Sequence, residues 1–325
     1  MDEKILSSEF DVKLNSYNLL REEALFILEK NLAESDIKIG NIENRIKSKK
    51  SFIDKAIVNK YEAPFTEIND ILGIRVIALF LSDIDKIVKI IRESFFPISV
   101  DDKINSSSSE FGYLSVHLIV KMKPEYNGPR YDHIKDLAFE IQVRTITMNS
   151  WANISHYLDY KSDFDIPQEL KRDFYALSGL FYVADQHFEL FFKQSRKNRA
   201  RIDKLFEKGN NTYSQEINLD TLSSYLRVKL PDREHGNSNK YSEVIEELRA
   251  CGYNSIQQID EAFVKCWDAF IQYEKDYPPK NGRGKAVSFM DTGVIRSIFD
   301  IYDEKFRQRR KSPIQDLSKY ILLIK

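Results

Sequence analysis

The chain is poor in the residues that interrupt regular structure. Its 325 residues include only 11 glycines and 9 prolines. This low usage predicts long regular elements with few extended linkers, and it excludes collagen-like and low-complexity architectures. An excess of charge of one sign is also lacking, because the chain has 49 basic and 50 acidic residues. A globally basic nucleic-acid coat protein is therefore excluded, and any basic function must lie in a local patch.

Cysteines and long apolar runs are equally scarce. Cys251 and Cys266 stand alone, so they form no C-x-x-C motif and allow at most one bridge. We expect reduced thiols in a cytoplasmic protein. Residues 1–10 carry acidic side chains and no apolar run, which predicts that there is no signal peptide. The longest apolar stretch, Val76–Leu81, is too short to span a bilayer, so we expect no membrane partner.

Helical and extended patterns alternate in the first half of the chain. The helical patterns cover residues 8–32, 48–60, 83–96, 145–160 and 168–208, and the extended ones cover residues 37–47, 71–80, 113–122 and 137–144. Interleaved strands and helices predict an α/β or α+β sheet domain.

Only helical patterns follow Gly209–Thr212, a polar, turn-forming segment. We therefore predict a first domain over residues 1–208 and an all-helical second domain over residues 209–325. Apolar stripes in the second domain must be buried against each other, against the first domain or against a partner. A structural or dimerisation module and a regulator of the first domain both fit this pattern, and a homo-oligomer is one outcome.

Polar side chains alternate with apolar ones along Phe139–Arg144. The alternation places Glu140, Gln142 and Arg144 on one face of a strand, each about 7 Å from the next. A carboxylate, an amide and a guanidinium in a row can hold a metal ion or activate a hydroxyl beside a phosphate. A half-exposed strand with a solvated polar face is the alternative.

Two further segments suggest phosphate chemistry. Asp70 precedes an apolar run that contains Arg75, and a guanidinium there needs a partner, because burying a lone charge is costly. A phosphate or an adenine ring would serve, as would a structural ion pair. The basic segment Arg45–Ser51, with Lys55 beyond it, is either a solvated surface or the cationic side of a polyphosphate site.

The segment Phe111–His117 enters a strand from a serine-rich loop. Tyr113, Ser115 and His117 share one face of that strand. A tyrosine beside a glycine on a loop suits stacking on a base, although a lone Tyr or His at such a place is more often structural.

Taken in order, these motifs resemble the synthetase domain of the RelA/SpoT family of alarmone synthetases. The matching blocks are R-x-K-x(3)-S-x(3)-K, D-I-x-G-I-R, G-Y-x-S-x-H and the highly specific E-I-Q-x-R-T-x-x-M-x-x-W-A-x-x-x-H-x-L-x-Y-K, which together run from Arg45 to Lys161. The serine-rich loop before Gly112 departs from the family pattern, so the identity of the acceptor stays open.

The resemblance implies a nucleotidyltransferase-like fold, which is a mixed sheet flanked by helices. It also implies a transfer of pyrophosphate from ATP to the 3′-hydroxyl of GDP or GTP, with release of AMP. Asp70 and Glu140 are then the Mg²⁺ ligands, and Glu140 also activates the acceptor hydroxyl. The residues that match ATP-site positions are Arg45 and Arg75 on the adenine and Lys47, Ser51 and Lys55 on the phosphates. The residues that match acceptor-site or phosphate-site positions are Tyr113 on the guanine, with Ser115, His117, Gln142, Arg144, His156 and Lys161.

Two other functions fit the same motifs. A toxin-type relative would make adenine alarmones or modify the 3′ end of tRNA, with the helical domain as a fused neutralising or sensing module of the toxin–antitoxin kind. A non-catalytic nucleotide-binding regulator is the third hypothesis, and the presence of every charged residue of the motif argues against it.

Overall fold

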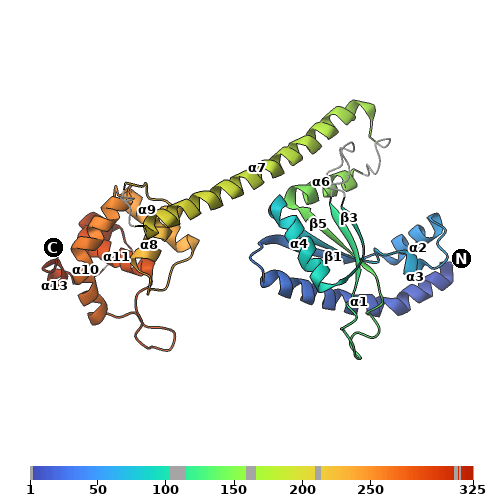
Figure 1. Cartoon of the computed structure of the whole chain (residues 1–325), viewed down its shortest axis with the longest axis horizontal. Helices are drawn as coiled ribbons and strands as arrows, with labels where there is room; N and C mark the ends of the chain where they lie inside the picture. The colour runs from blue at the N-terminus through green and yellow to red at the C-terminus, as the bar shows by residue number, and fades with distance from the viewer. Residues whose placement is uncertain are drawn as a thin grey trace. The chain divides into compact units, whose positions relative to one another are not determined.

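A computed structural model describes most of the chain, and its contacts divide into two compact units. The described residues are 3–102, 115–158, 166–208, 214–310, 314 and 316–324. The first unit is Met1–Phe192 and the second is Lys193–Lys325 (Figure 1).

The first unit is built on a five-stranded mixed sheet in the order β1-β2-β5-β4-β3. The strands are β1 (Ile39–Ile46), β2 (Leu72–Ala78), β3 (Phe96–Asp102), β4 (Val116–Lys121) and β5 (Phe139–Thr145). The central pair β2 and β5 runs parallel, and the other neighbouring pairs run antiparallel. The predicted mixed sheet is thereby confirmed.

Helices flank this sheet. The helices of the first unit are α1 (Glu3–Ala33), α2 (Lys49–Val58), α3 (Pro64–Glu67), α4 (Leu81–Ser94), α6 (Ile146–Tyr157) and the first part of α7 (Gln168–Glu207). Both α1 and α4 pack against strands, and α4 also contacts α1. Their apolar residues join those of the central strands in one core cluster, to which α4 contributes Ile84, Ile87 and Ile91.

Alternation along the central strands creates the two faces of the sheet. On β5, Phe139, Ile141 and Val143 are fully buried in the core cluster, while the residues between them are only partly buried. The polar face predicted for this strand is therefore real. β5 ends at Thr145, whose hydroxyl accepts a hydrogen bond from the Met148 N–H and so caps α6 directly after the strand.

One strand was not predicted. The helix expected over residues 83–96 ends at Ser94, and β3 begins at Phe96. Phe95 is fully buried at the turn, with its ring 5.3 Å from that of Phe139. Because β3 is an edge strand whose side chains are mostly exposed, it lacks the apolar alternation that reveals a strand in a sequence.

The second unit is helical, as predicted. It contains α8 (Leu219–Lys229), α9 (Ser238–Ala250), α10 (Ile256–Asp276), α11 (Asp291–Tyr302), α12 (Glu304–Arg309) and α13 (Ser318–Ile321). Its core cluster includes Ile202 and Phe206 from the end of α7, so that helix contributes to both units. The domain boundary after residue 208 stays a prediction.

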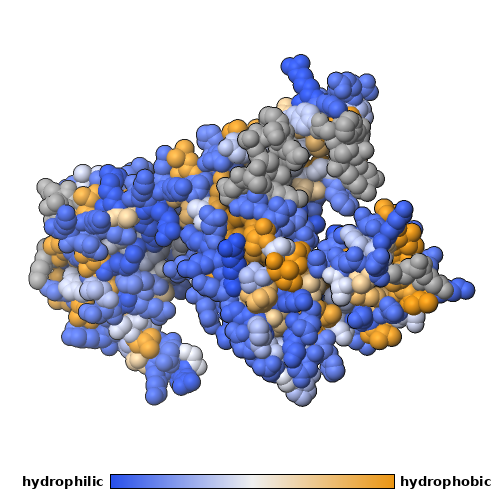
Figure 2. All heavy atoms as spheres, turned by 45° about the vertical axis from the view of Figure 1, so that its right-hand side comes forward, coloured by the Kyte–Doolittle hydropathy of each residue, from blue (hydrophilic) through white to orange (hydrophobic). Residues whose placement is uncertain are grey.

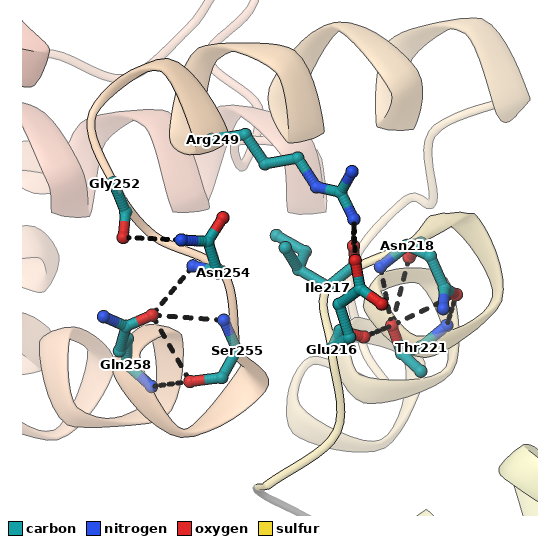
Figure 3. A network of polar contacts seen from close by, with 9 residues as sticks. All are labelled: Glu216, Ile217, Asn218, Thr221, Arg249, Gly252, Asn254, Ser255 and Gln258. Carbon is teal, nitrogen blue, oxygen red and sulfur yellow. Dashed lines mark hydrogen bonds and ion pairs between the residues drawn. The ribbon is translucent and has the colours of Figure 1, made fainter.

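Capping interactions fix where two helices of the second unit begin. Asn218 starts α8 and Ser255 starts α10, each with a capping box, and Figure 3 shows both networks. Between them Arg249 Nη2 donates to the Glu216 carboxylate and to the Ile217 carbonyl, both at 2.6 Å. These contacts hold the segment before α8 against the C-terminal end of α9.

The surface is mostly hydrophilic on the face that Figure 2 shows. Within the described residues, no helix combines the length and apolar character needed to cross a membrane. Cys266 is buried and Cys251 is half-buried, and both are free thiols.

Candidate active site

An open pocket lies over β1, β2 and β5 of the first unit. Its empty space, including the part open to solvent, is about 430 Å³. The lining residues are Glu43, Asn44, Arg45, Asp70, Gly73, Ile74, Arg75, Glu140 and Gln142. Strand register brings them together, because Arg75 of β2 pairs with Glu43 of β1 on one side and with Gln142 of β5 on the other.

Asp70 stands just before β2 and is held by two lysines. Lys47 Nζ lies 2.8 Å from one carboxylate oxygen and Lys55 Nζ lies 3.0 Å from the other. Lys47 follows β1, and its N–H donates to the Ile71 carbonyl at 2.8 Å, while Lys55 lies on α2. Burial raises the pKa of Asp70, but the hydrogen bonds and charges of the two lysines outweigh it and leave the pKa below its usual range.

Glu140 is the second carboxylate of the pocket. His117 Nδ1 lies 2.7 Å from Glu140 Oε1, and Gln142 Nε2 donates to Glu140 Oε2 at 2.8 Å. Burial raises the pKa of Glu140, but the hydrogen bond and charge of His117, with the bond from Gln142, bring it below its usual range. Ser115 Oγ lies 2.6 Å from His117 Nε2 and fixes the far side of the ring.

The guanidinium of Arg75 is held on three sides. Nε donates to Gln142 Oε1 at 3.2 Å, and Nη1 lies 3.4 Å from Asn153 Oδ1 and 3.5 Å from Glu43 Oε2. Asn153 is on α6, so contacts from two strands and a helix orient one side chain. Arg45 lines the same pocket from β1.

Arg144 adds positive charge beside this cluster. Burial, and next the charge of Arg75, lower the pKa of Arg144 to about 10. Its Nε is buried and has no hydrogen-bond partner among the described residues. It therefore stays charged at neutral pH in surroundings that favour a nearby anion.

The structure brings most of the predicted site residues together, but not all of them. Ser51 is exposed in the first turn of α2, where it bonds to the N-cap Ser48. His156 is exposed in the last turn of α6 and does not line the pocket. Tyr113 and Lys161 lie outside the described residues.

Other residues of the site are not among those predicted from the sequence. Glu43 and Gly73 line the pocket, and Asn153 contacts Arg75. Glu43 stands two residues before Arg45 on the same strand, so the period of two could have placed it on the same face. Asn153 becomes recognisable only when α6 is placed over the sheet.

The carboxylates suit a magnesium ion shared with a substrate. Asp70 and Glu140 line one pocket and are close enough for the charge of Asp70 to raise the pKa of Glu140. Mg²⁺ is commonly held by one or two carboxylates together with substrate phosphates and waters. Among the described residues no three His, Cys, Asp or Glu side chains form a metal-binding group, so the phosphates would have to supply the remaining ligands.

Known proteins share this part of the chain. Residues 44–165 match the model of a region found in RelA / SpoT proteins. GTP pyrophosphokinase YwaC of Bacillus subtilis (strain 168) is 31% identical over 164 residues, which are 49% of this chain and 76% of that protein. GTP pyrophosphokinase YjbM of the same organism is 33% identical over 135 residues, which are 40% of this chain and 61% of that protein.

A solved structure shares the fold of the first unit. The crystal structure of the small alarmone synthetase 1 from Bacillus subtilis matches with a TM-score of 0.50 and 26% identity, over 58% of this chain and 98% of that one. The match covers nearly all of that structure, and the family model ends before the helical unit begins. The chain belongs to the RelA/SpoT family, and its first unit carries a domain of the small alarmone synthetase type.

Proposed function

We propose that the protein is a GTP/GDP pyrophosphokinase, which transfers the β,γ-pyrophosphate of ATP to the 3′-hydroxyl of GDP or GTP and releases AMP. One observation supports this above the others. Two ionised carboxylates, Asp70 and Glu140, open into the same pocket as Arg45 and Arg75. A polyphosphate–Mg²⁺ substrate needs both signs of charge within one site, and two curated relatives are named GTP pyrophosphokinases.

The reaction is a substitution at the β-phosphorus of ATP. The 3′-oxygen of the acceptor forms a bond to this phosphorus, and the bond from it to the α,β-bridging oxygen breaks. AMP leaves with that electron pair, and the proton of the 3′-hydroxyl passes to Glu140. Since Glu140 has a lowered pKa, it is ionised and able to accept this proton at neutral pH, and contacts from His117 and Gln142 fix its orientation.

Asp70 and Glu140 are the residues that would hold Mg²⁺. The ion would neutralise phosphate charge and align the reacting oxygens. Lys47 and Lys55 are the cations in contact with Asp70, and together with Arg144 they supply positive charge for the transferred group. Most of the catalysis then comes from positioning and charge neutralisation.

The test is a transfer assay with ATP labelled in the β- or γ-phosphate. The pure protein is incubated with Mg²⁺ and, in separate reactions, GDP, GTP, unlabelled ATP and tRNA. We expect label on GDP or GTP and release of AMP. Label on tRNA or on an adenine nucleotide instead would support the toxin-type function, and no transfer to any acceptor would contradict the synthetase assignment.

Two variants link that activity to the pocket. Asp70→Asn and Glu140→Gln each remove one carboxylate and keep the size of the side chain, and we expect both to lose transfer with every acceptor. The Mg²⁺ concentration that gives half-maximal rate should rise in any variant that retains measurable activity.

A further inference from the structure

Neither the backbone conformation nor the packing at position 73 requires a glycine. Gly73 lies inside β2, where a glycine weakens the strand. It is not among the described residues with positive φ, and a Cβ built on it would meet no described heavy atom within 4 Å. What the glycine provides is open space on the polar face of the sheet, inside the pocket.

Three charged positions surround that space. In the register of β1 with β2, Arg45 pairs with Gly73 and Glu43 pairs with Arg75. The two arginines are therefore diagonal neighbours, which places their backbones about 7–8 Å apart. A flat ring lying over Gly73 would have one guanidinium on each side, an arrangement that favours stacking on a purine. Glu43, which pairs with Arg75, completes the group of four neighbouring positions formed with Arg45, Gly73 and Arg75.

The carboxylate of Glu43 lies beside the open space over Gly73, which we call the slot. Its Oε2 is 3.5 Å from Arg75 Nη1, and its Oε1 accepts a hydrogen bond from Asn149 Nδ2 at 3.3 Å. The side chain is 37% exposed and lines the pocket, so it can also meet a ligand. A base that stacks on the Arg75 guanidinium would present its edge to Glu43.

We infer that Glu43 is a specificity-determining residue, which selects a donor nucleotide with an amino group at position six of the purine. An ionised carboxylate only accepts hydrogen bonds. Placed at the six position, rather than at N1, it would bind the amino group of adenine and repel the carbonyl oxygen that hypoxanthine and guanine carry there. This inference rests on the proposed function, since it takes the base of the pyrophosphate donor to lie over Gly73.

The experiment compares ATP with inosine 5′-triphosphate as donor. The two carry the same charge and differ only at one edge of the base, where adenine has a six-amino group and an unprotonated N1 and hypoxanthine has a six-carbonyl oxygen and an N1–H. Electrostatic effects on the phosphates therefore cancel in the ratio of their kcat/KM values. With wild-type protein and one fixed acceptor, we expect ATP to be preferred at least tenfold. Glu43→Gln should reduce this preference to less than threefold, because an amide can turn its NH₂ group toward a carbonyl oxygen.

A matched control separates base selection from the positioning of Arg75. Asn153→Ala removes another contact of the same guanidinium, and it should slow transfer from both donors alike while leaving their ratio unchanged. Gly73→Ala is a second probe that should not disturb the fold, since the added methyl meets no described atom. It should raise the KM for both donors at least fivefold by filling the slot.

Calorimetric measurement of the binding of ATP and of inosine 5′-triphosphate, without acceptor, distinguishes failure of the inference from failure of the proposed function. A protein that prefers ATP through Glu43 but transfers nothing would contradict the proposed function and support the inference. A protein that transfers pyrophosphate with the same donor ratio in wild type and Glu43→Gln would overturn the inference and leave the proposed function standing.

Discussion

His117 of β4 and Glu140 of β5 are joined by a 2.7 Å contact between Nδ1 and Oε1. The contact belongs to a chain of hydrogen bonds that runs from Ser115 through His117, Glu140 and Gln142 to Arg75. This series of hydrogen bonds crosses three neighbouring strands. It connects the carboxylate proposed as the proton acceptor with the guanidinium proposed to hold the donor base, so both are oriented by one network.

The first prediction concerns the charge of Glu140. Glu140→Gln keeps the size of the side chain but removes the group that accepts the proton and helps to hold Mg²⁺. We expect transfer to fall by at least about 10³-fold, within the range for loss of a general base, with an unchanged circular dichroism spectrum. The labelled-ATP assay at saturating Mg²⁺ measures this.

A control for this substitution is available in the same unit. Glu125→Gln removes the same charge from an exposed side chain, which is 68% accessible and pairs with Lys123. Its activity should match that of the wild type. Near-normal turnover of Glu140→Gln would place the proton acceptor elsewhere.

The second prediction concerns Asp70 and pH. Because its pKa is lowered in the folded protein, the carboxylate stabilises the fold above its unfolded pKa, and this stability is lost as the pH falls through the lowered folded pKa. At neutral pH we expect Asp70→Asn to be less stable than the wild type by about 1 kcal/mol, the order found for accessible ion pairs. The difference should vanish in acid, where Asp70 is protonated in the wild type as well.

Urea unfolding at a series of pH values, with chelator present, tests this prediction. The two tryptophans, Trp151 and Trp267, lie in different units. A Trp267→Phe background therefore lets the fluorescence of Trp151 report on the first unit alone. A stability difference that persists in acid would mean that the aspartate acts through packing rather than charge.

Much of the first unit can be predicted from local patterns. The alternation in β5 placed Glu140, Gln142 and Arg144 on one face, since side chains on a strand repeat every two residues whatever surrounds them. β3 could not be predicted, because an exposed edge strand carries no apolar signature. The roles of Glu43 and Gly73 depend on the register between two strands, which the residues of either strand alone do not specify.

The third prediction separates the two substrate sites. Arg75→Ala should raise the KM for ATP far more than that for the acceptor, because the guanidinium lines the pocket beside Gly73. Tyr113→Ala should do the opposite, with a loss of about 1–3 kcal/mol for one base-stacking contact. Initial rates with each substrate varied in turn measure both effects. If Tyr113→Ala affected the two KM values equally, the tyrosine would have a structural role.

The last prediction concerns the second unit, whose helices lie beyond the stretch matched by the family model. All pocket-lining residues precede Lys193, and Phe192 still packs on the first unit, with its ring 4.0 Å from that of Phe80. We therefore expect a chain ending at Phe192 to fold, as judged by circular dichroism, and to keep its KM for ATP within about threefold. The choice of end matters, because a chain ending at residue 208 would retain Ile202 and Phe206 without the core cluster that buries them, and it should be less soluble.

The kcat of the chain ending at Phe192 then decides between the two hypotheses for the second unit. A regulator must bind the active and inactive states of the first unit with different affinity, so its removal must change kcat or cause growth arrest on expression. A purely structural or dimerisation module predicts the same kcat and no new growth arrest. A truncated chain that fails to fold would contradict the prediction that the first unit folds on its own. Regulation would then be tested in the full-length protein with point substitutions in the core of the second unit, such as Phe263→Ala.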